Sequence, residues 1–256
     1  MKTSNKLLLA PFAIFVLLGL MGMVYLRTSL VPRGIGNGGE LIQGEGDLQK
    51  KEIQVGSFDK VLASQGMEYQ LVKGTGQVTI EAETNLLPYI EPKVDGGQLS
   101  IGVKEGYSLR ESLEKPITIT IGFQELQALT IRDGAMVEVK DTISTTDFRS
   151  QVHSGSEGKL LINATNVFLD IHSGSNLKAG GTCTTLDARV NSAAELQAFD
   201  LISTDATVTT HSAANARVYV TGTLNASAHS AAEVLYRGDP TKVRSNAHSA
   251  GEVKAD

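Results

Sequence analysis

The chain has 256 residues, of which 41% are hydrophobic and 5% aromatic, with 26 glycines and no tryptophan. This composition allows one or two domains and is typical of a thin, repetitive all-β core. The formal net charge of −5 argues against nucleic-acid binding, because such proteins need clustered basic residues to neutralise phosphates. The single cysteine, Cys183, can form no internal disulfide, so we expect a packed, unreactive thiol.

The first 27 residues predict a signal anchor, a transmembrane helix that stays attached to the protein. Lys2 and Lys6 precede residues 7–26, a run of twenty uncharged and mostly apolar residues that begins at Leu7 and ends at Leu26. As a helix this run is about 30 Å long, which matches the hydrocarbon core of a bilayer. No Ala-x-Ala-like cleavage site follows it, which favours an anchor, with a cleaved signal peptide as the alternative. The basic residues at the amino terminus predict that this end stays inside, with the rest of the chain outside.

Residues 28–47 predict a flexible linker, because they are rich in glycine and poor in apolar residues. Residues 48–256 are expected to form the head. Short runs in its front half alternate apolar and polar residues, which predicts strands. The apolar positions of these runs are Ile53 and Val55, Val61 and Ala63, Tyr69 and Leu71, Val78 and Ile80, Leu99, Ile101 and Val103, and Ile117, Ile119 and Ile121.

Three further segments of the front half carry other signals. Residues 85–90 predict one helical turn, with Asn85 as its cap and Pro88 limiting its length. Residues 104–115 predict a charged loop. Residues 124–139 predict an early, degenerate copy of the repeat found further on. The front half is thus interpreted as the irregular first part of one domain, with a separate hairpin domain as the alternative.

A short phrase recurs through the C-terminal half at nearly constant distance. It begins at His153, His172, Asn191, His211, His229 and His248, and reads His-Ser-Gly-Ser, His-Ser-Gly-Ser, Asn-Ser-Ala-Ala, His-Ser-Ala-Ala, His-Ser-Ala-Ala and His-Ser-Ala-Gly. The intervals are 19, 19, 20, 18 and 19 residues, which identifies a structural repeat. The residues before each phrase alternate apolar with polar, which is typical of strands. All five histidines of the protein open a copy of the phrase.

A unit of this length with strands and no helical pattern cannot enclose a core alone, so the units must stack. The sequence therefore predicts an all-β fold, a parallel β-helix with coils of about 19 residues, and the usual handedness of parallel connections predicts a right-handed path. The small residues of the phrase are expected at the corners, where the backbone needs unusual dihedrals. The inward positions just before the phrases shrink toward the C-terminus, which predicts a tapering core or a cap. They are Val152, Ile171, Val190, Thr210, Ala228 and Ala247.

The outward histidines allow two interpretations. Imidazoles on adjacent coils are common metal ligands. However, Asn191 interrupts the column and no carboxylate recurs beside it, so we favour a structural ladder and expect no metal site.

Motif searches return no catalytic signature, phosphate loop or metal-binding spacing. Some parallel β-helices are polysaccharide lyases or hydrolases that use aligned carboxylates. Here Asp170, Asp187 and Asp200 fall at different places in their coils, so no pair is placed by spacing to share a substrate. We therefore expect no catalytic residues, no cofactor and no enzyme activity.

The repeated phrase, with Gly-Ser-Phe-Asp-Lys-Val at residues 56–61 and Asn-Leu-Leu-Pro-Tyr-Ile-Glu at residues 85–91, resembles the head GIN domain family. These are bacterial proteins, particularly of Bacteroidetes, described as "putative autotransporter adhesins". The family's phrase is usually Ser-Gly-Ser-Gly, which this chain keeps only in part. The likeness covers residues 46–256 and implies a β-helical, exported head, with no catalytic residue to carry across.

These observations lead to a functional hypothesis. We expect a membrane-anchored adhesin or surface-binding protein, with its head in the periplasm on the bacterial inner membrane or exported to the cell envelope. Its partners would be a glycan or an envelope protein, contacted along the polar coil faces. The alternatives are a structural or scaffolding envelope protein, with the last coil's strand edge pairing with a partner, and a β-helical polysaccharide-active enzyme.

Overall fold

The fold is described from a computed structural model, over residues 35–36, 39–111 and 115–256. Within these residues the regular secondary structure is almost entirely β-strand, and Ile35–Asp256 form one compact unit. The predicted membrane segment, residues 7–26, lies outside the described residues. In the part that is described, no helix is both long and apolar enough to cross a membrane.

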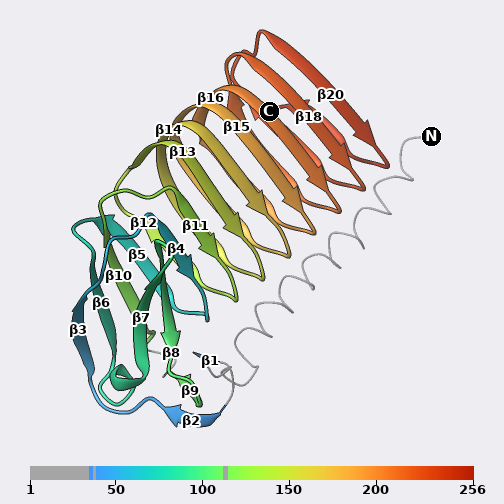
Figure 1. The fold of residues 1–256 in the computed structure, drawn as a ribbon. Helices are drawn as coiled ribbons and strands as arrows, with labels where there is room; N and C mark the ends of the chain where they lie inside the picture. Colours follow the sequence, from blue (N-terminus) through green and yellow to red (C-terminus); the bar gives the residue numbers. More distant parts are fainter. Residues whose placement is uncertain (1–34, 37–38, 112–114) are drawn as a thin grey trace. The chain divides into compact units, whose positions relative to one another are not determined.

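The C-terminal half forms a parallel β-helix, which confirms the predicted fold class (Figure 1). Each coil pairs in parallel with the next, so backbone hydrogen bonds run between coils about 4.8 Å apart. Its strands are β11 (Ala128–Ile131), β12 (Met136–Val139), β13 (Ile143–Val152), β14 (Glu157–Ile171), β15 (Asn176–Asn191), β16 (Glu195–His211), β17 (Asn215–Val220), β18 (Thr223–His229), β19 (Glu233–Arg237), β20 (Lys242–His248) and β21 (Glu252–Ala255).

The coil register confirms the predicted inward column. Val152 pairs with Ile171, Ile171 with Val190, Val190 with Thr210, Thr210 with Ala228, and Ala228 with Ala247. The first five of these residues are fully buried, which follows from their alternation with polar neighbours. Ala247 is exposed, as is the whole of β20, so the last coil does not form a buried cap.

The uneven repeat intervals are absorbed away from the recurring phrase. The pairing of β15 with β16 shifts between Lys178 and Gly180, and that of β16 with β17 shifts between Ala198 and Ile202. Such bulges let one coil hold an extra residue while the rest of the ladder stays in register. The phrase therefore returns to the same place in every coil.

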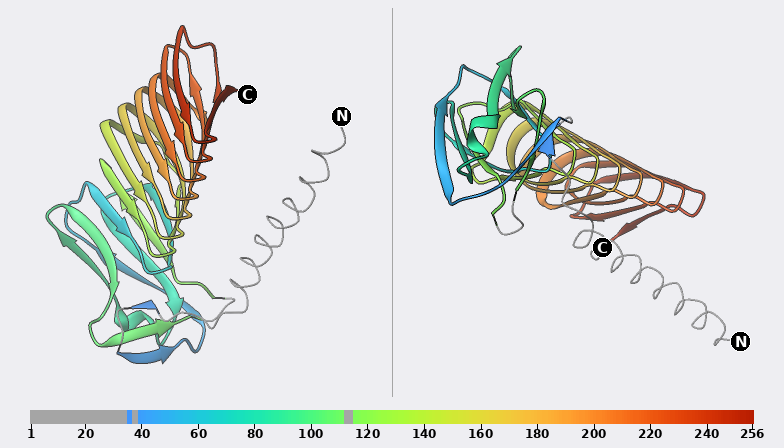
Figure 2. Two further views of the ribbon diagram at one scale, coloured as in Figure 1. Left: turned by 90° about the vertical axis from the view of Figure 1, so that its right-hand side faces the viewer. Right: turned by 90° about the horizontal axis from the view of Figure 1, so that it is seen from below.

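Each coil presents two main faces, separated by the corner that the phrase forms. We call the stretch leading into the corner the pre-corner face, which comprises β11, the C-terminal parts of β13 to β16, β18 and β20. The post-corner face comprises β12, the N-terminal parts of β14 to β16, β17, β19 and β21. A third ladder joins the N-terminal part of β13 to the middle of β14, β15 and β16 and ends at the pair Ser203 and Val220. Beyond that pair the coils narrow, in agreement with the predicted taper (Figure 2).

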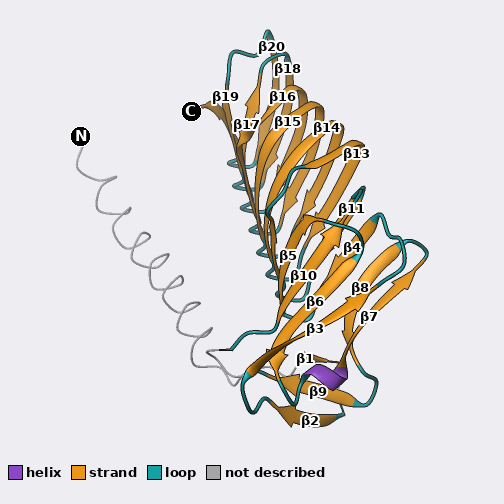
Figure 3. Ribbon diagram, turned by 90° about the vertical axis from the view of Figure 1, so that its left-hand side faces the viewer, coloured by secondary structure: helices purple, strands orange, loops and turns teal. Residues whose placement is uncertain are grey.

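The front half builds the other end of the β-helix, but not in chain order (Figure 3). The first coil consists of β4 and β5, and β11 and β12 stack on them in parallel. Between these two coils the chain leaves the stack, and β8 and β10 return to pair with the opposite side of β4 and β5. Antiparallel strands then extend the sheet. The strands of this part are β3 (Leu48–Gln54), β4 (Lys60–Ala63), β5 (Glu68–Lys73), β6 (Gln77–Glu83), β7 (Ile90–Asp95), β8 (Gln98–Val103) and β10 (Thr118–Phe123).

A small second sheet was not predicted. It consists of β1 (Ile35–Gly36), β9 (Tyr107–Arg110) and β2 (Glu40–Gln43), in that spatial order. β9 lies within the segment predicted as a charged loop, so that prediction is wrong over these residues. β1 and β2 lie within the stretch predicted as a flexible linker. Their polar, glycine-rich sequence gave no strand signal, because both strands depend on pairing with β9, which is distant in the chain.

The predicted helical turn is present as a short 3₁₀ helix, Leu87–Tyr89, with Pro88 in its first turn. Its N-cap is Leu86, and no side chain caps it, so the prediction of Asn85 as cap is wrong. Instead, the Asn85 amide donates to the Gln43 carbonyl at 2.7 Å and accepts from the Glu45 N–H at 2.8 Å. Asn85 therefore fastens the segment after β2 to the head.

Candidate binding surface

The corners of the β-helix are two-residue turns in which both central residues have positive φ. In the corner after His153, Ser154 has a φ of 61° and Gly155 a φ of 69°. The later corners keep this conformation with Ser-Ala, as at Ser212 (56°) and Ala213 (58°). Left-handed backbone is costly for residues other than glycine, so neighbouring coils must hold it in place. They do so through hydrogen bonds such as the one from the Ala213 N–H to the Ser230 carbonyl, at 3.0 Å.

Two earlier corners have the same conformation. Asp133 and Gly134 have φ values of 58° and 75°, which confirms the degenerate coil predicted at residues 124–139. Gln65 and Gly66, at 65° and 71°, form a further corner that the repeat did not predict, because β6 to β10 separate its coil in sequence from the next coil, β11 and β12. The shared signal is a polar residue followed by a small one, directly after an alternating strand.

The histidines that precede the corners form a stacked ladder on the outside. The rings of His153 and His172 are 5.0 Å apart with an interplanar angle of 3°, and those of His211 and His229 are 4.8 Å apart at 11°. Asn191 pairs across the sheet with His211 and interrupts the stack. The rings thus repeat at the spacing of the coils.

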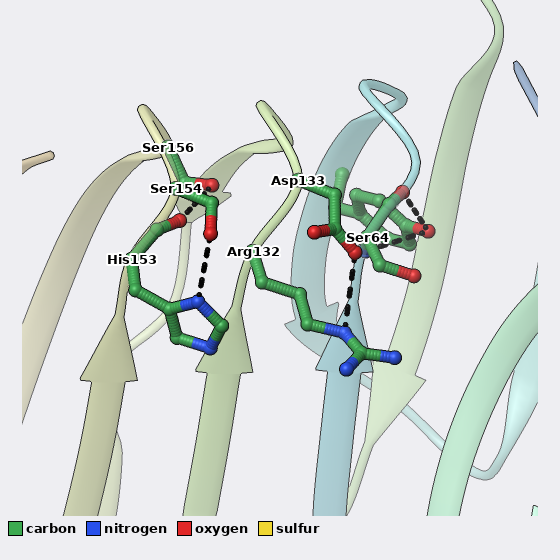
Figure 4. Close-up of polar contacts among 7 residues, drawn as sticks. Ser64, Arg132, Asp133, His153, Ser154 and Ser156 are labelled. Atoms are coloured by element: carbon green, nitrogen blue, oxygen red, sulfur yellow. Dashed lines mark hydrogen bonds and ion pairs between the residues drawn. The ribbon is translucent and has the colours of Figure 1, made fainter. Parts of the chain in front are cut away.

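The first two histidines of the ladder also contact the serine of their own corner. Figure 4 shows His153 Nδ1 facing the Ser154 hydroxyl, and the two atoms are 3.1 Å apart. The Ser156 hydroxyl donates a hydrogen bond to the His153 carbonyl at 2.8 Å. His172 and Ser173 repeat the first contact at 3.0 Å. Burial and the neighbouring His172 both lower the pKa of His153.

The ladder does not gather metal ligands. Stacked rings place their nitrogens in parallel planes and not around a common point, whereas a metal site needs converging donors. Among the described residues, no group of three or more His, Cys, Asp or Glu side chains is arranged to hold a metal ion. This geometry fits a structural role for the ladder.

Burial raises the pKa of the Cys183 thiol to about 11, so it stays protonated near neutral pH.

The pre-corner face displays regular outward columns of polar side chains. One column runs Arg149, Phe168, Asp187, Thr207, Asn225 and Arg244, and its neighbour runs Gln151, Asp170, Arg189, Thr209, Ser227 and Asn246. These residues are exposed or half-buried. Nearly all can donate or accept hydrogen bonds, so the face is a flat, repetitive polar surface.

A shallow groove of about 170 Å³ opens in this face over β13, β14 and β15. Its outward lining is Arg149, Gln151, Phe168, Asp170, Asp187 and Arg189. The Arg149 guanidinium lies over the Phe168 ring, 4.9 Å from its centre. Arg189 Nε approaches Asp187 Oδ1 of its own strand at 3.8 Å. The groove thus combines an aromatic ring, two guanidinium groups and two carboxylates.

The post-corner face uses its charges differently, because they pair between coils. Lys159 contacts Glu138 at 2.9 Å, Lys254 contacts Glu233 at 2.6 Å, and Arg217 contacts Glu195. Hydrogen bonds from Lys140 and Lys159 lower the pKa of Glu138. The charges of the post-corner face are thus largely neutralised by one another. The pre-corner face is therefore the candidate binding surface.

The three carboxylates considered for lyase chemistry separate into two groups. Asp170 and Asp187 line the same groove, on adjacent coils and adjacent columns, although their spacing in the sequence predicted no shared placement. Asp200 lies elsewhere, on the third ladder opposite Gly180. The proximity of Asp170 and Asp187 was not predicted, because their positions differ by two residues along the coil. In the structure, positions two residues apart form neighbouring columns.

Comparison with known proteins places the chain in a family. Residues 57–240 match the model of the family described as "Putative auto-transporter adhesin, head GIN domain". No match was found among curated proteins.

Three solved structures share the fold. A "putative adhesin" from Bacteroides fragilis has 15% identity and a TM-score of 0.77, over 84% of this chain and 100% of that one. A "putative adhesin" from Parabacteroides merdae has 14% identity and a TM-score of 0.70, over 85% and 99%. A "putative lipid binding protein" from Parabacteroides distasonis has 20% identity and a TM-score of 0.68, over 85% and 100%. At these identities the likeness shows the fold, and the family match over most of the head shows that this chain belongs to the head GIN domain family.

Proposed function

We propose that the protein is a non-enzymatic, envelope-exposed binding protein whose pre-corner face holds extended polar ligands, glycans above all. The observation that carries this proposal is the regular columns of exposed hydrogen-bonding side chains on that face. Repeated weak contacts along an extended ligand add up to useful affinity without a deep pocket. The adhesin description of the family supports the same conclusion.

The binding proposal is tested with the purified full chain in detergent on a glycan array. Retention of one class of glycan, without release of shorter products, is the expected result. Release of shortened chains would instead favour a polysaccharide-active enzyme.

We further propose that residues 7–26 anchor the protein in a bacterial inner membrane, with the head in the periplasm or exported further into the envelope. The apolar length of this segment supports the proposal. Membrane fractionation combined with protease digestion of intact spheroplasts tests it. The head should be in the membrane fraction and accessible to protease, and a head found in the cytoplasm would contradict the proposal.

A scaffolding role in the envelope is the second candidate. It is favoured by β20, which is exposed along its length, with 40% of Val243 accessible, and whose registered partner among the described residues is β18. An exposed strand edge can pair with a strand of another protein. Affinity purification after cross-linking in cells separates the two roles. A stoichiometric envelope partner in the absence of any glycan binding would support scaffolding over adhesion.

A further inference from the structure

We propose that the groove over β13, β14 and β15 is a subsite for a carboxylated sugar, such as a uronic acid residue within a glycan chain. This inference rests on the proposed function and names its site and ligand class. The three strands lie side by side in the β-helix (Figure 1), so the six outward side chains of the groove come from consecutive coils.

The Arg149 side chain is oriented but not neutralised by a protein group. Its guanidinium is stacked over Phe168, and within the described part of the chain no hydrogen bond or ion pair engages its side chain. Stacking on an aromatic ring leaves the N–H edges of a guanidinium free. Those edges match the two oxygens of a carboxylate, which arginine binds in a bidentate manner. Arg149 is thus prepared for an anionic group.

The groove also contains polar groups that would bind the hydroxyls of a sugar. Asp170 and Arg189 occupy paired positions on neighbouring coils, yet no ion pair joins them, since Arg189 leans toward Asp187 at 3.8 Å. The carboxylate of Asp170 and the amide of Gln151 likewise make no hydrogen bond in the described residues. Across the post-corner face, by contrast, equivalent charges pair between coils. The groove therefore keeps acceptors and donors free for hydroxyl groups beside a site for a carboxylate.

The shape of the groove limits the size of its ligand. A groove of about 170 Å³ is too small and too open for a drug-sized molecule, which needs several hundred Å³. It suits one ring of a longer chain. Such a chain can continue over the next coils, where Thr207, Thr209, Asn225 and Ser227 extend the same columns. The ligand is thus a polymer with acidic sugar units, held by one charged subsite and a polar track.

The test measures binding of a tetragalacturonate to the full chain in detergent, alongside the same tetrasaccharide after reduction of its carboxyl groups. We expect the acidic form to bind at least ten-fold more tightly than the reduced form. Arg149→Gln should remove most of that difference. Arg237→Gln is the matched control, because Arg237 also stacks on a phenylalanine, Phe199, but lies on β19 of the post-corner face, and it should leave both affinities unchanged.

The outcomes separate this inference from the function on which it rests. Equal binding of acidic and reduced tetrasaccharides, or an acidic preference that survives Arg149→Gln, would overturn the subsite while leaving glycan binding intact. Binding of neutral glycans alone on the array would do the same. A second variant, Phe168→Leu, should weaken acidic binding by releasing Arg149, and unchanged thermal unfolding of each variant shows that the fold is retained.

Discussion

At the scale of single residues, the corners carry the strongest local constraint. Both central residues of every corner lie in left-handed backbone, yet only the early corners use glycine at the second position. The small residues of the phrase predict the position of a corner. They do not predict its dihedrals, because Ser-Ala has no intrinsic preference for positive φ. The hydrogen bonds from neighbouring coils impose the conformation.

This constraint predicts opposite effects of two exchanges. Gly155→Ala should lower the free energy of unfolding by about 1 kcal/mol, because alanine is strained at positive φ although a methyl group there would meet no neighbour within 4 Å. Ala213→Gly should be neutral or stabilising by up to about 1 kcal/mol for the same reason. Chemical denaturation measures both, and a Gly155→Ala protein as stable as the wild type would count against strained corners.

The histidine ladder predicts a dependence of stability on pH. Burial and His172 lower the pKa of His153 in the folded protein below the value of about 6.5 expected in the unfolded chain. As pH falls through that value, the unfolded chain takes up the proton first, so the free energy of unfolding decreases. Calorimetry between pH 8 and pH 5 should show the melting temperature falling less steeply in His153→Asn than in the wild type. Identical slopes would show that this group does not contribute.

At the scale of elements, the repeat predicted the coils because each unit carries the same local information. Alternation placed Val152, Ile171 and Val190 inward, and the period placed them on top of one another. The strand pairing of the front half could not be predicted in the same way. β4 and β5 belong to the coil directly beneath β11 and β12, but a long detour of the chain separates them in sequence. Alternation identified these strands without saying which strand pairs with which, since pairing depends on contacts distant in sequence.

Stacked positions also predict unequal costs of truncation. Ile171→Ala removes a fully buried side chain from the middle of the inward column and should destabilise the head by about 2–5 kcal/mol. Ile202→Ala is the matched control, because 46% of its side chain is exposed, and it should change stability by less than about 0.5 kcal/mol. Denaturant titration compares them, and equal losses would contradict the assigned facing of the coils.

At the scale of the whole molecule, composition and period together predicted an all-β, thin-cored head, and the family match agrees. The right-handed path remains a prediction, as does the membrane anchor. The candidate groove could not be predicted from the sequence, because its residues become neighbours only when three coils stack. Asp170 and Asp187 were recognised as candidates, but Arg149 and Phe168 drew no attention as isolated residues on an alternating strand.

The central claim, that this head binds an extended glycan without cleaving it, is tested most directly by one measurement. A polyuronate of defined length is incubated with the full-length protein in detergent, and both co-sedimentation and final polymer length are recorded. We predict that the polymer sediments with the protein at unchanged length and that Arg149→Gln weakens this association. Shortening of the polymer, or no association with this or any other glycan, would contradict the account.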